Sequence, residues 1–550
     1  MIGDFVHNVD KITDFLFRAK KEGAQLAVFS ELTLCSYAPL DLVERSDFLE
    51  AHDAALLRLR DQLTGDDVPE IVVIGGLERN KKLSGRALHN SAFVFQKGEL
   101  LDSYAKRLLP TYDVFDEARY FEPGDRTCKL DIKLTGGESL RLGISICEDA
   151  WFEQEASGRR RYTDDPAHDL RGCDLVVNLS ASPFELNKRE RRQSEISGFA
   201  LRVGAPVVYV NQVGANDEIL FDGASLVFDA TGRKIFEAPV WDESLDLVEL
   251  NVEKKEIVAP KISSTKKVNS SDPMEVLFDG LVVGIHDYFS KSGFSKAVIG
   301  LSGGIDSAVV AVLAAAALGP KNVLGVSLPG PYSSSHSLAD AEELANKLGI
   351  EHRVHSIKFM NTAALMELKS SFAGLPPDVT EENLQSRLRG LFLTALANKR
   401  RALLLATGNK SELAVGYCTT YGDMAGAIAP IGDIYKTRVY ELAQYINRKW
   451  RGVIPESTMT KAPSAELRPN QKDQDSLPPY DELDKILESY FEGGESAEAL
   501  VSFGFKAPVV HRVFELIRLS EFKRRQAAPV LKVTSKAFGL GRRIPIVRRS

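Results

Sequence analysis

The sequence has little cysteine and lacks the residue spacings that commonly bind a metal or cross-link a fold. Its five cysteines are odd in number and scattered, and no C-x-x-C pair occurs. Such usage argues against a disulfide framework and fits a reducing compartment, so we expect a cytoplasmic protein. The nine histidines contain no H-E-x-x-H pattern, which removes the commonest zinc-protease signature.

Long apolar runs and an excess of positive charge are also absent. The longest apolar run, residues 308–318, is too short to cross a membrane and is typical of a buried helix. The net charge is −7, whereas general binding to nucleic acids depends on lysine and arginine neutralising phosphates. We therefore expect neither a membrane nor a nucleic acid as a partner.

The sequence does contain two successive series of β-like and helical segments. Seven runs rich in Val and Ile predict strands in the first 250 residues: LAVFS, EIVVIGG, SAFVF, RLGISIC, DLVVNLS, PVVYVNQ and SLVFDATG. Helical stretches such as residues 8–22 and 188–203 lie between them. Strand-like KAVIGLS, NVLGVSLPG and RALLLATG alternate with later helices over residues 306–318 and 337–348. The pattern predicts an α/β protein.

A charged, Ser-rich stretch separates the two series. Residues 251–273 have almost no large apolar side chains, which is typical of a linker. The chain is therefore expected to have one domain over residues 1–250 and a second over residues 274–550.

The stretch GLSGGIDSA, residues 300–308, follows a predicted strand and opens a predicted helix. Glycines let the backbone approach a phosphate closely, and N–H groups at a helix start point at the anion. Ser302 and Ser307 add hydroxyl groups, and Asp306 could hold Mg²⁺. The lysine of a Walker loop is missing. A plain glycine turn is the alternative, but the strand–loop–helix placement favours phosphate binding.

SGGIDS resembles the signature of the ATP pyrophosphatase (PP-loop) family. Its members adenylate a carbonyl or carboxylate oxygen, and a nitrogen or sulfur nucleophile then displaces AMP. Further segments are similar to NAD synthetases, in that family's order and over nearly all of residues 275–545: LPGPYSSSHSLADAEELANKLGI, EENLQSRLRG, LLATGNKSELAVGYCTTYGDMAGAIAPIGDIYKT, KAPSAELRPNQKDQDSLPPYDELD and EFKRRQAAPVLKVTSKAFG. The resemblance implies a doubly wound parallel sheet.

The same resemblance implies roles for residues of the second half. The residues implied to bind ATP are Gly300, Leu301, Ser302, Gly303, Gly304, Ile305, Asp306, Ser307 and Thr407. Those implied to contact deamido-NAD are Asn383, Glu412 and Lys523, with Arg387 as a further phosphate contact. Asp306 and Glu412 would also be ligands of Mg²⁺. Residues 461–479 are polar and contain proline, and we predict that they close over ATP.

In the first half, Cys147 ends the apolar run of GISICEDAW. A nucleophilic thiol needs a base and a positive group near the oxyanion. No histidine is close in sequence, but Glu31 in VFSELTLCSY and Lys106 in YAKRLLPTYDVFDEARYF each end a strand-like run. A single cysteine on a strand is usually a buried apolar residue, so the prediction rests on the three residues together.

Glu31, Lys106 and Cys147 resemble the catalytic triad of the nitrilase (carbon–nitrogen hydrolase) family. The resemblance covers residues 1–250 and implies an α-β-β-α sandwich. Glu31 would be the general base, Lys106 would stabilise the tetrahedral intermediate, and Cys147 would form a thioester. Glu117 matches a second glutamate of that family, and the residues implied to bind glutamine are Tyr112, Ser182 and Lys188.

Together the halves resemble the glutamine-dependent NAD synthetases. That family transfers ammonia from glutamine to deamido-NAD, using ATP and Mg²⁺, and releases NAD, AMP, pyrophosphate and glutamate. The resemblance implies a homo-oligomer and an enclosed path for ammonia. The family commonly opens with a strand like ALAQINPTVGDF, whereas this sequence opens with MIGDF, so we expect its first strand to be missing.

Three alternatives stay open at this stage. A tRNA-modifying PP-loop enzyme would need an RNA-binding domain or cysteines near SGGIDS, and neither is visible. A scaffold protein built from two enzyme folds has no need of the intact triad and loop. The third alternative is a synthetase that uses only free ammonia, because the expected loss of the first strand could leave the amidase inactive.

Overall fold

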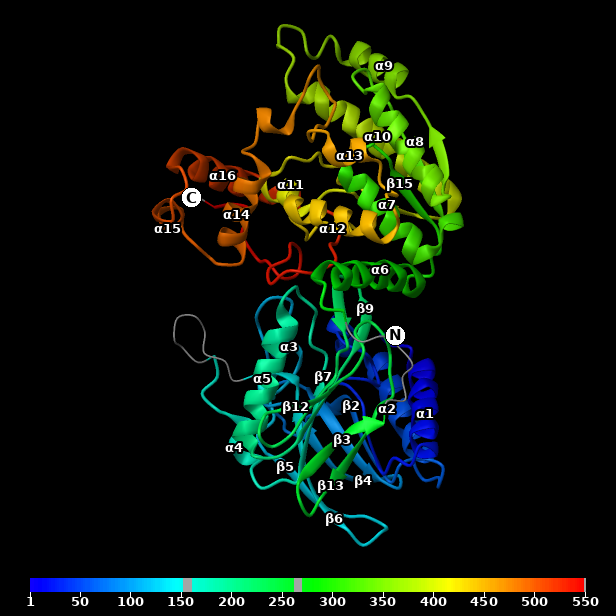
Figure 1. Ribbon diagram of the computed structural model, residues 1–550, viewed down its shortest axis with the longest axis vertical. Helices are drawn as coiled ribbons and strands as arrows, with labels where there is room; N and C mark the ends of the chain where they lie inside the picture. The colour runs from blue at the N-terminus through cyan, green and yellow to red at the C-terminus, as the bar shows by residue number, and fades with distance from the viewer. Residues whose placement is uncertain (152–160, 262–269, 549–550) are drawn as a thin grey trace. The chain divides into compact units, whose positions relative to one another are not determined.

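The computed structural model describes residues 1–151, 161–261 and 270–548, which form two compact units. One unit comprises residues 1–216 and 220–271, and the other residues 217–219 and 272–550. The fold class is α/β, as predicted (Figure 1). Among the described residues, no helix combines the length and apolar character needed to cross a membrane.

The first unit is built on two sheets. One has the strand order β1-β2-β3-β4: β1 (Leu26–Val28), β2 (Ile71–Arg79), β3 (Leu88–Gln96) and β4 (Glu99–Ala105). The other has the order β12-β11-β8-β7-β6-β5: β12 (Lys234–Glu237), β11 (Leu226–Phe228), β8 (Val207–Asn211), β7 (Leu175–Ser180), β6 (Ser139–Ile146) and β5 (Cys128–Lys133). Buried side chains of β2 and β3 pack against those of β6 and β7, so the main core lies between the sheets.

Helices cover the outer faces of this sandwich. They are α1 (Phe5–Lys21), α2 (Ser46–Gln62), α3 (Glu117–Tyr120), α4 (Pro166–Asp169) and α5 (Lys188–Val203), with 3₁₀ helices η1 (Leu40–Glu44) and η2 (Cys147–Ala150). Figure 1 shows α1 and α2 on one side of the sheets and α5 on the other. This is the predicted α-β-β-α layering. Two hairpins complete the unit: β9 (Val213–Asn216) with β10 (Ile219–Asp222), and β13 (Leu247–Asn251) with β14 (Glu256–Lys261).

The hairpin of β13 and β14 corrects the predicted linker. Residues 256–261 are paired with β13 rather than extended between domains. Charged Glu256 and Lys261 stand at its two ends, with the apolar pair Ile257 and Val258 between them, and a two-stranded hairpin tolerates such a composition. Residues 262–269 of the predicted linker lie outside the described residues.

The second unit contains a four-stranded parallel sheet of order β17-β16-β15-β18. Its strands are β15 (Ala297–Gly300), β16 (Val323–Ser327), β17 (Glu351–Val354) and β18 (Leu403–Leu405). Strand β16 pairs with one edge of β15, and β18, which comes later in the sequence, pairs with its other edge. The strand order therefore reverses at β15, which is where doubly wound sheets bind ligands.

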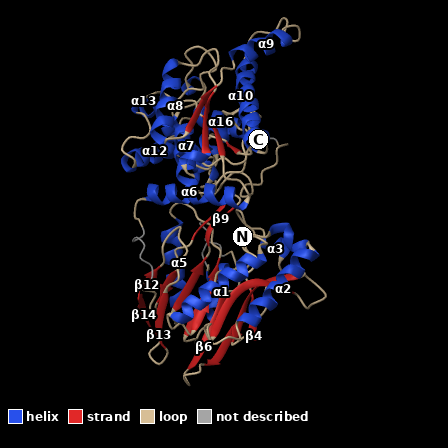
Figure 2. Cartoon of the chain, turned by 90° about the vertical axis from the view of Figure 1, so that its right-hand side faces the viewer, coloured by secondary structure: helices blue, strands red, loops and turns tan. Residues whose placement is uncertain are grey.

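Helices flank this sheet on both faces. They are α6 (Pro273–Lys291), α7 (Ile305–Leu318), α8 (Ser335–Leu348), α9 (Lys358–Leu368), α10 (Val379–Arg400), α11 (Lys410–Val415), α12 (Lys436–Lys449), α13 (Glu456–Thr460), α14 (Tyr480–Phe491), α15 (Ala497–Ser502), α16 (Ala507–Leu519) and α17 (Glu521–Arg524), with 3₁₀ helices η3 (Pro320–Asn322) and η4 (Asp473–Asp475). Figure 2 shows α7 and α8 on one face of the strands and α10 on the other. The apolar run of residues 308–318 is the buried helix α7, as predicted.

Candidate functional site

The three residues of the predicted triad follow the ends of three strands in the first unit. Glu31 comes after β1, Lys106 directly after β4, and Cys147 directly after β6. Cys147 has a φ of 42°, in the left-handed region, where a residue with a side chain is strained. All three side chains are buried. The strained turn fixes the direction of the thiol at the end of a rigid strand.

A buried hydrogen-bond network joins Glu31, Lys106 and Glu117. The Lys106 ammonium group donates to Glu31 Oε1 over 2.7 Å and to Glu117 Oε1 over 2.8 Å. Asn90 Nδ2 also donates to Glu31 Oε1, and the Ala181 N–H donates to Glu31 Oε2. Each carboxylate is therefore held in one orientation, as a positioned acid or base requires.

Burial and charge set the protonation of this network. Burial acts to lower the pKa of Lys106, but the charges of Glu117 and Glu31 outweigh it and raise that pKa well above its ordinary value. Burial raises the pKa of Glu117 to about 7, against the opposing effect of Lys106. Lys106 is therefore a permanent positive charge at neutral pH, suited to stabilising an oxyanion.

Cys147 lies close enough to this network for its charges to affect the thiol. Burial raises the pKa of Cys147 well above its ordinary value, and the negative charge of Glu31 raises it further, while Lys106 acts in the opposite direction. The resting side chain is therefore a neutral thiol. Its proton must be taken by a base during attack, which is the role that the resemblance gives to Glu31.

Two acidic residues after Cys147 were missed by sequence reasoning. Asp149 accepts from the backbone N–H groups of Leu108 and Ile146 and from the Tyr104 hydroxyl, so it ties the Cys147 turn to the Lys106 segment. Glu148 is buried beside Cys147. The sequence C-E-D could have revealed them. Two acidic residues directly after an apolar strand are expected to be buried, and a buried carboxylate needs hydrogen-bond partners.

The three residues predicted to bind glutamine lie in segments around the Cys147 turn. The Tyr112 hydroxyl donates to both Glu148 carboxylate oxygens, over 3.1 and 3.0 Å. The Ser182 N–H donates to Asn211 Oδ1 after the end of β7. Lys188 starts α5, and its ammonium group lies 5.6 Å from the centroid of the Trp151 ring. The arrangement supplies both charge signs near the thiol, as an amino acid substrate requires.

The second unit has a cavity of about 400 Å³ at the reversal point of its sheet. Eleven of the twelve residues predicted to bind ATP or deamido-NAD line it, and the twelfth is Gly303. Those lining it are Gly300, Leu301, Ser302, Gly304, Ile305, Asp306, Ser307, Asn383, Thr407, Glu412 and Lys523. Arg387, predicted as a phosphate contact, is exposed and does not line this cavity.

The loop between β15 and α7 has the form predicted for a phosphate site. Gly303 has a φ of 77°, and a Cβ atom there would lie 2.2 Å from the Ser337 carbonyl oxygen, so only glycine fits. Ser302 Oγ accepts from the Gly304 N–H and lies 3.2 Å from Ser307 Oγ. These contacts hold the loop open at the start of α7, where N–H groups and the helix dipole favour an anion.

Lys436 lies between the two predicted Mg²⁺ ligands and was missed by sequence reasoning. Its ammonium group donates to Asp306 Oδ2 and, over 3.2 Å, to Glu412 Oε1. Burial raises the pKa of Glu412 to about 8, although Lys436 opposes the shift. A lysine distant in sequence gives no local signal that it will reach these carboxylates.

The donor set fits a magnesium ion that arrives with a nucleotide. In the described part of the chain, no three Asp, Glu, His or Cys side chains converge into a ready-made metal site. Mg²⁺ is commonly held by one or two carboxylates together with substrate phosphates and water. Asp306 and Glu412 supply two carboxylates at the phosphate loop, which is what that mode requires.

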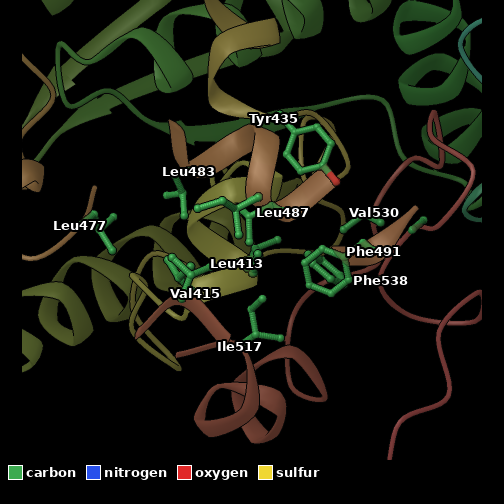
Figure 3. Close-up of a cluster of buried hydrophobic side chains, with 14 of the residues drawn as sticks. Leu413, Val415, Tyr435, Leu477, Leu483, Leu487, Phe491, Ile517, Val530 and Phe538 are labelled. Atoms are coloured by element: carbon green, nitrogen blue, oxygen red, sulfur yellow. The ribbon is translucent and has the colours of Figure 1, made fainter. Parts of the chain in front are cut away.

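The elements that carry these residues are fixed by packing on their far sides. Figure 3 shows Leu413 and Val415 of α11 pointing into a cluster with Leu483, Leu487 and Ile517. Asn409 caps α11 by accepting from the Glu412 N–H, and it donates to Asp306 Oδ1. The apolar face of α11 thus holds Glu412 against the phosphate loop.

Comparisons with known proteins match both halves of the chain. The carbon-nitrogen hydrolase family model matches residues 2–256, and the NAD synthase family model matches residues 277–527. The glutamine-dependent NAD(+) synthetase of Synechocystis sp. is 43% identical over all of this chain and 97% of its own length. The glutamine-dependent NAD(+) synthetase of Thermotoga maritima is 40% identical over 100% of this chain and 97% of its own length.

A solved structure extends the similarity to three dimensions. The glutamine-dependent NAD+ synthetase from Acinetobacter baumannii, in complex with adenosine diphosphate, aligns with a TM-score of 0.76 and 35% identity. The alignment covers 99% of this chain and 96% of that one. The chain therefore belongs to the glutamine-dependent NAD(+) synthetase family, which joins a carbon-nitrogen hydrolase domain to an NAD synthase domain.

Proposed function

We propose that this protein makes NAD from deamido-NAD, with ATP as the activating nucleotide and glutamine as the source of nitrogen. It is a carbon–nitrogen ligase that uses glutamine as amido donor. The observation that carries this function is that one chain holds both a buried Glu–Lys–Cys centre and a cavity lined by a phosphate loop. Close relatives over the whole length bear that activity in their names.

The first unit releases ammonia from glutamine. Glu31 takes the proton of the Cys147 thiol as the sulfur attacks the side-chain amide carbon. Lys106 stabilises the negative oxygen of the tetrahedral intermediate. The C–N bond then breaks, the leaving nitrogen takes the proton, and a thioester remains on Cys147. Water, deprotonated by Glu31, hydrolyses the thioester to glutamate and frees the thiol.

Glutamine is held by groups around the Cys147 turn. Tyr112, Ser182 and Lys188 bind the substrate, and Lys188 offers a positive charge for its α-carboxylate. Glu148 offers the opposite charge and already accepts from the Tyr112 and Tyr162 hydroxyls. A carboxylate for the α-ammonium group and an ammonium group for the α-carboxylate would discriminate a free amino acid from a peptide.

The second unit uses this ammonia. The phosphate loop of residues 300–307 and Thr407 bind ATP, and Asn383, Glu412 and Lys523 bind the dinucleotide. The nicotinate carboxylate attacks the α-phosphorus of ATP and pyrophosphate leaves. Ammonia then attacks the acyl carbon and AMP leaves, which yields the amide. Asp306 and Glu412 would hold Mg²⁺, which neutralises charge on the phosphates when bound.

Ammonia must reach this step unprotonated, because ammonium has no lone pair for the attack. Most ammonia released into neutral water would be protonated. An enclosed path between the two centres is therefore part of the proposal. The homo-oligomer implied by the family belongs to the proposal too.

The test compares two nitrogen donors on two proteins. NAD formation from deamido-NAD, ATP and Mg²⁺ is measured with glutamine or with ammonium, for the wild type and for Cys147→Ala. We expect the wild type to use both donors and the variant to use only ammonium. Absence of NAD with either donor on the wild type would refute the acceptor and reopen the other PP-loop activities.

A further inference from the structure

Four basic side chains line the cavity of the second unit, and they differ in what neutralises them. They are Arg389, Lys436, Lys461 and Lys523. Lys436 is paired with Asp306 and Glu412, and Lys461 with Asp340. Lys523 donates instead to the carbonyl oxygens of Gly416 and Cys418. Lys523 was predicted to contact a substrate, and it forms no salt bridge with another described residue.

Arg389 shares this property with Lys523. Its Nε donates to the Leu328 carbonyl oxygen over 3.0 Å, and within the described ranges it forms no salt bridge. The side chain is partly buried. Burial lowers the pKa of Arg389 from its ordinary value, yet a guanidinium stays charged in a protein. The cavity wall therefore carries a positive charge that no carboxylate of the described residues pairs with directly.

The two acidic side chains whose charge reaches Arg389 are engaged elsewhere. These are Glu466 and Asp423. The Glu466 carboxylate accepts from the Ser334 N–H and hydroxyl and from the Ser337 hydroxyl. Asp423 accepts from the Thr419 N–H and from the Ser386 hydroxyl. Neither carboxylate forms a salt bridge with Arg389 among the described residues.

The position of Arg389 is fixed beside the phosphate loop. A Cβ atom on Gly330 would lie 2.9 Å from Arg389 Nη2, so the guanidinium packs directly on the chain that follows β16. Leu393, one turn further along α10, would lie 3.1 Å from a Cβ atom on Gly300. Helix α10 thus lays Arg389 over the carboxyl ends of the strands that lead into the loop.

We propose that Arg389 binds a phosphate group of a nucleotide substrate and positions that nucleotide in the cavity. A partly buried charge is costly unless a partner neutralises it. The planar guanidinium matches a phosphate through two parallel N–H···O bonds. The inference rests on the proposed function, which supplies two polyanionic nucleotides, ATP and deamido-NAD. Either can provide the phosphate, and the experiment separates them.

The test measures KM and kcat of Arg389→Gln with ammonium as donor, so that the first unit plays no part. ATP and deamido-NAD are varied in turn. We expect the KM of one nucleotide to rise about 10-fold or more while kcat changes by less than about 3-fold, the signature of lost binding. The nucleotide whose KM rises is the one whose phosphate is held. Arg389→Lys should restore part of the lost nucleotide binding, because an ammonium group keeps the positive charge but not the two parallel hydrogen bonds of the guanidinium.

Thermal unfolding distinguishes binding from a structural role. Removal of an unpaired charge should leave the melting temperature without nucleotide unchanged or higher, while the rise on adding the nucleotide shrinks. Arg400→Gln is the matched control: Arg400 ends the same helix, is paired with Glu351 and does not line the cavity. It should leave both KM values unchanged.

Two results would overturn the inference. One is that Arg389→Gln leaves both KM values within about 2-fold of wild type. The other is that it lowers the melting temperature without nucleotide and leaves the nucleotide-induced rise intact, which marks a structural clamp on Leu328. Failure of the proposed function would look different, since the wild type would then form no NAD from ammonium.

Discussion

Lys106 neutralises two buried carboxylates, so its loss affects both chemistry and stability. We expect Lys106→Gln to lower glutamine-dependent NAD formation by about 100-fold or more, because the oxyanion loses its cation. Activity with ammonium should persist. Removing one partner of a buried ion pair typically costs about 3–5 kcal/mol, so the first unit should also unfold earlier.

The control for Lys106→Gln is Lys82→Gln. Lys82 forms an exposed pair with Asp125 in the same unit, and such pairs add little stability. It should change neither glutamine use nor unfolding. Equal glutamine activity in Lys106→Gln and the wild type would contradict the role of Lys106.

His52 provides a prediction about pH. Its Nε2 accepts from the Leu77 N–H over 3.0 Å, and burial lowers the pKa of the imidazole, against the charge of Asp53. The unfolded chain therefore binds a proton near pH 6.5 that the folded chain resists. Stability should be intact above that pH and should fall as the pH drops through it.

The measurement is the unfolding midpoint in urea between pH 7.5 and 5.5. His52→Gln keeps an acceptor for the Leu77 N–H but cannot titrate, so its midpoint should fall less on acidification. His7→Gln, which alters an exposed histidine of the same unit, should behave as the wild type. If the unfolding midpoint of the wild type changed with pH as much as that of His52→Gln, His52 would not be the group responsible.

At this scale the sequence predicted residues whose chemistry is rare and missed those whose role depends on a distant partner. Glu31, Lys106 and Cys147 each end a strand, where the resemblance could be read. The pairing of Lys436 with Asp306 spans 130 positions along the chain and has no local pattern. Which cavity cations remain unpaired is likewise decided by tertiary contacts.

Among the elements, the loop between β15 and α7 tolerates least change. Gly303→Ala would combine a strained φ with a close contact to the Ser337 carbonyl oxygen, so the loop must shift. We expect the KM for ATP with ammonium as donor to rise about 10-fold or more. Gly319→Ala, at the far end of α7, is the control. Its φ of 82° imposes backbone strain on alanine as at Gly303, but its Cβ atom would meet open space, so it tests strain without the close contact.

Most residues of the segment 461–471 line the cavity, and the acidic side chains of Asp340, Glu382 and Glu466 hold the segment in place. Glu466 binds Ser334 and Ser337 at the start of α8, and Gln385 Nε2 donates to the Leu467 carbonyl oxygen. These contacts support the prediction that residues 461–479 close over ATP. Glu466→Ala should loosen it and speed tryptic cleavage after Lys461 and Lys472.

Limited proteolysis with and without ATP plus deamido-NAD checks this. The nucleotides should protect the wild type more than Glu466→Ala, and Glu488→Ala, an exposed change on α14, should match the wild type. Cleavage at the same rate in all three proteins, unaffected by nucleotides, would remove the closing role.

Element prediction succeeded where burial was continuous and failed where it alternated. Strands such as β7 are buried at every position, and the helix of residues 188–203 was predicted with its observed bounds. Strand β5 alternates exposed polar and buried apolar side chains, and β4 is largely exposed. Strand β5 was therefore not predicted, and β4 was predicted only as the strand-like run that Lys106 ends. Strand β14 was missed because it lies within the predicted linker.

For the whole molecule, we expect a homo-oligomer. Several large apolar side chains of α9 and α10, and of the segment between them, are exposed in one chain: Phe359, Met366, Leu375, Val379 and Leu391. A contiguous exposed apolar patch marks the binding site of a partner, and we expect these side chains to form one. Light scattering should give a multiple of the chain mass of 60.5 kDa. A mass of one chain at micromolar concentration would contradict this.

Each reactive centre draws its described side chains from one unit: Cys147 and its neighbours from the first, Asp306 and its neighbours from the second. Glutamine hydrolysis in the first unit and NAD synthesis in the second could therefore proceed at different rates. Glutamine that is hydrolysed when no adenylated intermediate is present is consumed without forming NAD. The ratio of glutamate to NAD produced therefore measures how well the enzyme synchronises its halves. A ratio of one describes tight coupling, and every excess glutamate counts a nitrogen lost to the solvent.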